Sequence, residues 1–183
     1  MISLPFRRAS PAGNIDALYG MIVAQARNPD FYRGYGVPDT LEGRLDMIML
    51  HLVLVLRQLT KLHGALPPVG QRLFDRFCRD MDDNFREMGV GDLTVPKRMQ
   101  KVGEAFYGRT KVYEAALADA DPVALEAAVS RNVFAAPEPT TLGAKRLAAY
   151  MRTVAAHLAD LDASALTAAT FEFPAPSAIA EGR

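Results

Sequence analysis

The sequence predicts an all-α fold, a single-domain helical bundle of about six or seven helices. Apolar residues recur at spacings of three and four in one segment after another from residue 14 to residue 161, as on helices with one buried face. No segment shows the strict alternation of a half-buried strand. The 183 residues can bury one sizeable core, and short connections favour a bundle of neighbouring helices.

The first helix is expected over residues 14–27, with Asn14 as its N-cap. Residues 28–40, with the sequence NPDFYRGYGVPDT, then break the helical pattern. Two prolines and two glycines predict a loop, and its three aromatic residues indicate that it is packed. We expect flexible tails over residues 1–13 and 170–183 around a helical domain of residues 14–169.

The second helix is expected over residues 40–63, capped by Asp39 or Thr40. One face begins at Leu41, and further apolar residues cover most of the remaining circumference. A helix that is apolar nearly all round lies at the centre of a protein. Gly64 then ends this helix.

Later helices are expected over residues 69–88, residues 95–118, a short stretch after Asp121, residues 141–161 and residues 163–169. Gly103 and Gly108 fall inside the fourth of the expected helices, where each costs about 1 kcal/mol relative to alanine. Close packing against another helix, or a bound partner, would account for both glycines.

Composition excludes several classes of protein. The 21 basic and 21 acidic residues cancel, which argues against a nucleic-acid binder that must displace counterions, and no sequence-specific nucleic acid is expected. The single cysteine, Cys78, cannot form an internal disulfide and fits a reducing compartment. The longest apolar run, residues 47–56, is shorter than the roughly 20 residues of a membrane span. We expect a cytoplasmic protein, and a peripheral position on the inner face of the cytoplasmic membrane stays open.

The sequence contains no recognisable catalytic or metal-binding arrangement. His51 lies in the apolar run without a functional partner three or four residues away, which predicts a core histidine hydrogen-bonded to another element. There is no HExxH, no glycine-rich phosphate loop and no Gly-x-Ser-x-Gly. The acidic residues near Asp80 alternate with arginines, as on a solvated helix face. We therefore expect that the protein is not an enzyme and that it binds no cofactor and no metal ion.

A strip of basic residues follows the helix expected over residues 95–118. It is either a solvated face or a contact for acidic headgroups, RNA or an acidic partner. Its members are Lys97, Arg98, Lys101, Arg109 and Lys111.

Three strings carry a resemblance to a known family. They are FYRGYGVPDTLEGRLDMIMLHLVLVLRQL at residues 31–59, MDDNFREMGVGDLTVPKRM at residues 81–99 and EAFYGRTKVYEAAL at residues 104–117. In this order and spacing, and over about residues 14–160, the chain resembles the ubiquinol–cytochrome c chaperone family. The excess of arginine over lysine fits a bacterial member.

The resemblance implies an all-helical assembly factor of respiratory complex III without catalysis. Its client would be newly made cytochrome b. The ribosome or a membrane surface would contact the basic strip. Whether a small assembly partner protein takes part stays open. Aromatic residues and arginine make effective contact anchors, so the segments FYRGY and FYGR are expected to share an interaction surface, with Phe106 supporting it from beneath. The candidate partner-binding residues are Phe31, Tyr32, Arg33, Tyr35, Asp39, Arg44, Lys97, Lys101, Phe106, Tyr107, Arg109 and Lys111.

Two other classes stay open. One is a helical small-molecule or lipid-binding protein with a pocket lined by Met, Phe and Tyr side chains. The other is a hydrolase or transferase whose site contains a strongly perturbed carboxylate or histidine in a deep cleft.

Overall fold

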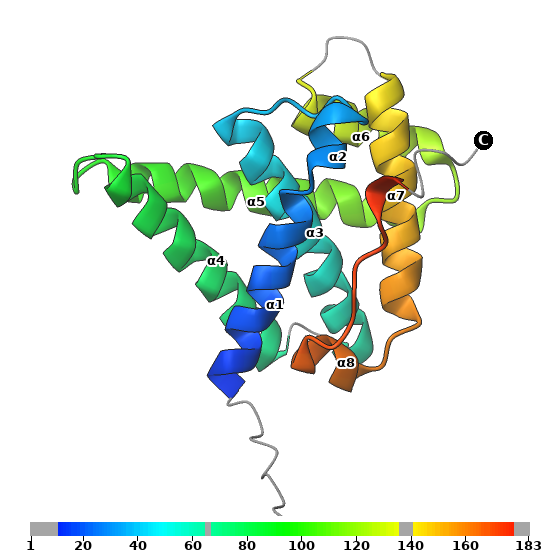
Figure 1. Ribbon diagram of the computed structural model, residues 1–183, viewed down its shortest axis with the longest axis horizontal. Helices are drawn as coiled ribbons and strands as arrows, with labels where there is room; N and C mark the ends of the chain where they lie inside the picture. Colours follow the sequence, from blue (N-terminus) through cyan, green and yellow to red (C-terminus); the bar gives the residue numbers. More distant parts are fainter. Residues whose placement is uncertain (1–10, 65–66, 136–140, 178–183) are drawn as a thin grey trace, which may run out of the picture.

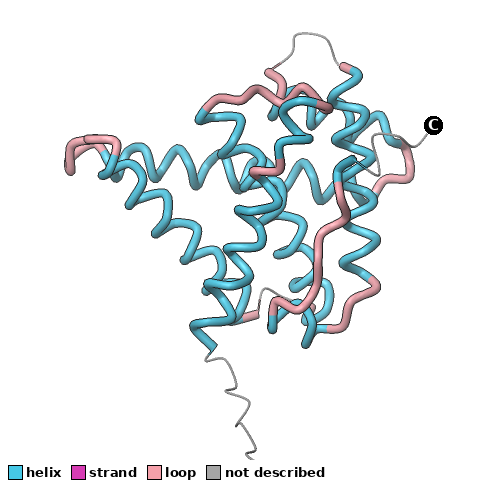
Figure 2. The backbone as a smooth tube through the Cα atoms, in the orientation of Figure 1, coloured by secondary structure: helices cyan, strands magenta, loops and turns pink. Residues whose placement is uncertain are grey.

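The computed structural model describes residues 11–64, 67–135 and 141–177. Within these ranges the chain forms eight α-helices and no β-strand (Figure 2). The helices are α1 (Pro11–Ala26), α2 (Pro29–Arg33), α3 (Leu41–His63), α4 (Pro68–Glu87), α5 (Val95–Ala118), α6 (Pro122–Val133), α7 (Leu142–Ala159) and α8 (Ala163–Ala168). This architecture confirms the predicted all-α bundle.

The helix starts follow local capping chemistry, with two differences from the prediction. The side chains of Thr40, Asp121 and Thr141 accept backbone N–H bonds at the starts of α3, α6 and α7, as expected. The predicted N-cap at Asn14 is wrong, because α1 already begins at Pro11, and proline tolerates the first helical turn. The predicted loop over residues 28–40 contains the short helix α2, whose N-cap is the side chain of Asn28.

Helix α3 forms the centre of the molecule. It packs against α1, α4, α5, α6, α7 and α8, and its middle turns are almost completely buried (Figure 1). The prediction of a central helix is therefore confirmed. Leu41 departs from the expected inner face, since 58% of its surface is exposed at the first turn. Helices α4 and α5 extend together to one side of the body and meet at the turn 88–94 (Figure 1).

His51 is a fully buried core residue, as predicted. Its Nδ1 donates to the Met47 carbonyl at 2.7 Å, and its Nε2 accepts from the Tyr150 hydroxyl at 2.9 Å. Gln25 donates in turn to the same hydroxyl oxygen, so α1, α3 and α7 share one buried network. Burial lowers the pKa of His51 to about 4, and the hydrogen bond to Met47 opposes this shift only in part.

The segment after α8 is packed, which corrects the expectation of a loose tail from residue 170. It runs back along the molecule from α8, and the ring of Phe173 packs against His51 of α3 (Figure 1). Gln25 donates to the Pro174 carbonyl at 3.0 Å, the Tyr35 hydroxyl donates to the Pro176 carbonyl at 2.7 Å, and Phe171 is buried. We call residues 170–177 the C-terminal segment. The outer parts of both predicted tails, residues 1–10 and 178–183, lie outside the described residues.

Candidate functional site

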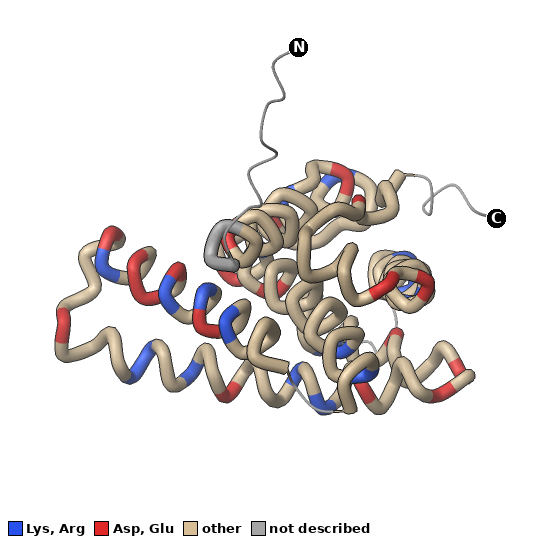
Figure 3. The backbone as a smooth tube through the Cα atoms, turned by 90° about the horizontal axis from the view of Figure 1, so that it is seen from below, with Lys and Arg blue, Asp and Glu red and all other residues tan. Residues whose placement is uncertain are grey.

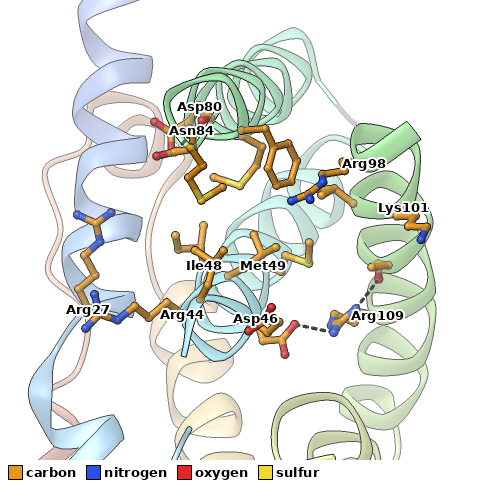
Figure 4. Close-up of a pocket in the computed structure, with 18 residues that line it drawn as sticks. Arg27, Arg44, Asp46, Ile48, Met49, Asp80, Asn84, Arg98, Lys101 and Arg109 are labelled. Atoms are coloured by element: carbon orange, nitrogen blue, oxygen red, sulfur yellow. Dashed lines mark hydrogen bonds and ion pairs between the residues drawn. The ribbon is translucent and has the colours of Figure 1, made fainter. Parts of the chain in front are cut away.

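A groove of about 620 Å³ lies between the first half of α3, the second half of α4 and the first half of α5 (Figure 4). Apolar side chains dominate its surface, and charged groups surround them. The apolar lining consists of Leu41, Leu45, Ile48, Met49, Met81, Phe85, Met88, Val102 and Ala105, and the polar lining of Arg27, Glu42, Arg44, Asp46, Asp80, Asn84, Arg98, Lys101 and Arg109.

Helices α4 and α5 pack against each other and line the groove opposite the start of α3. Between α4 and α5, Phe74 packs against Phe106 at 4.9 Å and against Tyr107 at 5.9 Å between ring centroids, and none of these three residues lines the groove. At the far end, Gly89 closes the turn with a φ of +75°, a conformation that favours glycine. The two helices therefore form one wall of the groove, opposite α3.

One ion pair ties this wall to α3. An Nη2 of Arg109 lies 2.5 Å from Oδ1 of Asp46, and the two side chains are only 17% and 13% exposed. Arg109 also donates to the carbonyls of Ala105 and Asn132. Burial raises the pKa of Asp46 to about 6, against the opposing pull of the Arg109 guanidinium. Burial accounts for this raised pKa, and the ion pair with Arg109 gives the carboxylate a structural role between α3 and α5.

The other charged side chains of the groove differ in whether they have a bonding partner. Asp80 accepts a hydrogen bond from the Tyr19 hydroxyl at 2.9 Å, and Arg44 pairs with Asp39 at 2.7 Å outside the groove. Arg98 lies over the ring of Phe85, at 5.6 Å from its centroid. The remaining cations project from opposite sides in Figure 4, with Arg27 on one side and Lys101 on the other. The groove thus combines an apolar floor with basic groups on both edges.

The region that builds this groove matches a family model. Residues 33–173 match the model described as "Ubiquinol-cytochrome C chaperone", which covers most of the chain. The chain belongs to the ubiquinol-cytochrome C chaperone family. This confirms the resemblance expected from the three sequence strings.

A solved structure supports the same assignment for this chaperone. The crystal structure of the Cbp3 homolog from Brucella abortus aligns with a TM-score of 0.79 and 34% sequence identity, over 91% of this chain and 92% of that one. A comparison with curated proteins finds no match. Among the described helices of the chaperone, none is both long and apolar enough to cross a membrane.

The structure separates the candidate residues of the chaperone into three groups. Arg44, Lys101 and Arg109 line the groove. A second group lies at partly or fully exposed positions that do not line it, and Tyr107 is the most exposed aromatic residue among them, at 64%. This second group consists of Tyr32, Arg33, Asp39, Lys97, Tyr107 and Lys111.

The third group corrects the expectation of exposed aromatic anchors at Phe31 and Tyr35, which are 0% and 2% exposed. Phe106 is 4% exposed, which agrees with its expected position beneath the surface. Phe31 packs edge-on against Tyr150 at 4.9 Å between centroids, and Phe106 sits in the cluster with Phe74. The segments FYRGY and FYGR therefore place much of their aromatic surface in the core, where it stabilises the fold instead of contacting a partner.

The expectation of close packing at two glycines of α5 is also wrong. A Cβ atom built on Gly103 or on Gly108 would meet no atom within 4 Å. Close approach occurs elsewhere, at Gly43, where a Cβ atom would lie 2.1 Å from the Pro38 carbonyl oxygen. The explanation that a partner binds near Gly103 and Gly108 stays a prediction.

Sequence reasoning missed most of the groove lining. Met49 and Met81 have the helical spacing of buried core residues, which does not distinguish a groove lining from the core, and Met88 is 47% exposed. The exposed cations Arg27 and Arg98 belong to segments that are distant in sequence. Only the pairing of α3, α4 and α5 shows that these residues share one surface.

Proposed function

We propose that this protein is a non-catalytic chaperone that binds cytochrome b during biogenesis of ubiquinol–cytochrome c reductase. The observation that carries the proposal is the family match over residues 33–173, a range that includes the three helices α3, α4 and α5 that line the groove. An assembly chaperone needs a stable scaffold with a partly apolar surface. The central helix α3 supplies the scaffold, and the groove supplies the surface.

The chemistry of the groove supports binding rather than catalysis. Its most perturbed acid, Asp46, is held by Arg109, and Asp80 is engaged by Tyr19 and by Arg76 at 3.6 Å. The buried His51 lies in the core network and does not line the groove. These groups hold helices together, whereas a catalytic group must reach the reacting atoms of a substrate.

The proposal includes a place of action. Exposed Lys97, Lys101 and Lys111 on α5 would contact the membrane surface or the ribosome while the client is inserted, with the chaperone itself on the cytoplasmic side. Figure 3 shows basic and acidic residues interleaved along α4 and mostly basic positions along α5 beside it. A small assembly partner protein would act with the chaperone at this stage.

A deletion strain tests the proposal. Loss of the gene should lower the b-type haem of complex III in difference spectra, together with the amount of cytochrome b, while the transcript level stays normal. Reintroducing the intact gene should restore both. A strain that keeps normal complex III and instead loses one metabolite conversion would contradict the chaperone function and favour an enzyme.

The groove also supports the alternative of a lipid-binding or small-molecule-binding protein, because Met and Phe side chains line a volume within the usual range for ligand pockets. Solvent extraction of the natively purified protein, followed by mass spectrometry, tests this alternative. Recovery of one apolar compound in stoichiometric amount would favour it over the chaperone function.

A further inference from the structure

We propose that the groove between α3, α4 and α5 binds an amphipathic segment of the client, in which an apolar face is bordered by carboxylates on both edges. This inference rests on the proposed function and names the chemistry of the client segment. The occupant is a polypeptide, and a lipid in the same place is an outcome that the experiment below can detect.

The floor of the groove fits the apolar face of such a segment. Ile48, Met49 and Met81 form buried parts of the lining, and the exposed side chains of Leu41 and Met88 extend the apolar surface toward solvent. Methionine is flexible and polarizable, so a methionine-rich surface adapts to client side chains of different shape. A groove of about 620 Å³ admits several side chains from one face of a helix.

The cations at the edges of the groove favour a ligand that carries negative charge. Arg27, Arg98 and Lys101 form no ion pair with another described residue, whereas Arg109 is paired with Asp46 inside the groove. The lining also contains three carboxylates: Asp46 is paired with Arg109, Asp80 is engaged by Tyr19 and Arg76, and Glu42 lies close enough to Asp46 to raise its pKa. Carboxylates supplied by a bound segment would meet cations with little competition from the groove itself.

The placement of the cations favours a polypeptide over a lipid. Arg27 follows the end of α1, whereas Arg98 and Lys101 project from α5, and the floor of α3 separates them (Figure 4). An amphipathic helix about 10–12 Å wide can present carboxylates to both edges at once. A single-headgroup lipid brings its charge to one edge and leaves the other without a partner.

The test uses three synthetic helical peptides with the same leucine–alanine face and with Glu, Gln or Lys on both borders of that face. Fluorescence anisotropy with the full chain measures their affinities at low and at high salt. The Glu peptide should bind about tenfold more tightly than the Lys peptide at low salt, because each partly exposed ion pair contributes modestly, and high salt should reduce the difference. Equal affinities, or a preference for the Lys peptide, would overturn the proposal.

Charge reversal locates the site. In the double variant Arg98→Glu, Lys101→Glu the preference should shift from the Glu peptide toward the Lys peptide. The matched control is Arg131→Glu, Lys145→Glu, which changes the same residue types at exposed positions on α6 and α7 outside the groove. The control should keep the preference for the Glu peptide. An identical effect of both double variants would show only a general charge effect and would contradict the assignment of the groove.

A third variant tests the apolar floor without changing charge. Ala105→Trp places a large side chain in the groove, and circular dichroism confirms that the variant folds. All three peptides should bind more weakly. Unchanged binding by a folded Ala105→Trp variant would exclude the groove as their site.

Two outcomes separate this inference from the proposed function. If the Arg98→Glu, Lys101→Glu variant fully restores cytochrome b in the deletion strain, the groove assignment fails and the chaperone function stands. If deletion of the gene leaves the amount of cytochrome b unchanged, the chaperone function fails, and the inference about a client segment fails with it. Oleate that binds more tightly than the Glu peptide, and that loses this binding in the same double variant, would assign the groove to a lipid.

Discussion

Two buried titratable groups make opposite contributions to stability as the pH changes. The folded state holds the pKa of His51 at about 4, below its ordinary value of 6.5, so its contribution is lost as the pH falls through this window. The pKa of Asp46 is raised from 3.8 to about 6, so its contribution is present at low pH and is lost as the pH rises through this window. The net pH profile of the protein therefore hides both effects unless one group is removed.

Replacing His51 with Gln isolates the first effect. The variant should be less stable at neutral pH, because the bonds to Met47 and Tyr150 are weakened, but it should still bind its client. Between pH 6.5 and pH 4 the wild type should lose about 3 kcal/mol more stability than the variant, which follows from the pKa shift. Urea titrations across this range measure the difference, and parallel pH profiles would contradict the prediction.

Glycine substitutions should act in opposite directions. Gly103→Ala and Gly108→Ala should each raise the free energy of unfolding by about 1 kcal/mol, because both positions are helical and have open space for a Cβ atom. Gly43→Ala should lower it by about 2 kcal/mol, because the new Cβ would collide with the backbone of Pro38. Urea titrations measure all three. A Gly108→Ala variant that is more stable but binds its client less tightly would support a partner at that face of α5.

At the scale of whole elements, the C-terminal segment covers part of the core at α1 and α3. Phe173 packs against His51 at 5.4 Å and against Phe171 at 5.2 Å between ring centroids. The backbone carbonyls of Pro174 and Pro176 in this segment accept hydrogen bonds from Gln25 and Tyr35, which lie far away in the sequence. The irregular part of this segment, residues 170–175, thus completes the aromatic cluster around the buried histidine.

Shortening the chain tests this role. A chain that ends after Thr170 should lose about 3 kcal/mol or more of stability, which is the usual cost of removing one buried aromatic side chain. A chain that ends after Ser177 keeps every contact described for the C-terminal segment and serves as the control. Thermal denaturation compares the two, and equal midpoints would show that the segment contributes nothing to the core.

The basic strip of α5 is the second feature at this scale. Changing Lys97, Lys101 and Lys111 together to Glu should reduce co-sedimentation with anionic membranes or ribosomes at low salt, since each basic residue near such a surface adds about 1 kcal/mol. A variant with only Lys97 and Lys111 changed separates the strip from the groove, which Lys101 also lines. Unchanged co-sedimentation of both variants would mean that the strip is only a solvated face.

At the scale of the whole molecule, stability should be graded from the centre to the end of the α4–α5 pair. Helix α3 packs against six other helices, whereas the turn 88–94 projects from the body with Leu93 92% exposed (Figure 1). Amides in the middle of α3 should exchange with solvent only on global unfolding, and those of the turn should exchange fastest. Hydrogen exchange followed by mass spectrometry measures this gradient, and strong protection of the turn would contradict it.

The candidate site could be predicted from the sequence only in part. Arg44, Lys101 and Arg109 were recognised from their place in the three strings and the basic strip, and all three line the groove. Phe31 and Tyr35 were misplaced because an aromatic residue in a proline-rich and glycine-rich segment has no periodicity that shows which way it faces.

The sequence by itself determined the fold class, the central position of α3 and most helix boundaries. Helical periodicity and caps such as Thr40 and Asp121 depend on interactions between residues only a few positions apart, so a single chain displays them directly. Only the tertiary structure decided that Arg27, Met49 and Lys101 share one groove and that the C-terminal segment is packed. Those features depend on how helices distant in sequence cross and fill space, and local spacing carries no record of that crossing.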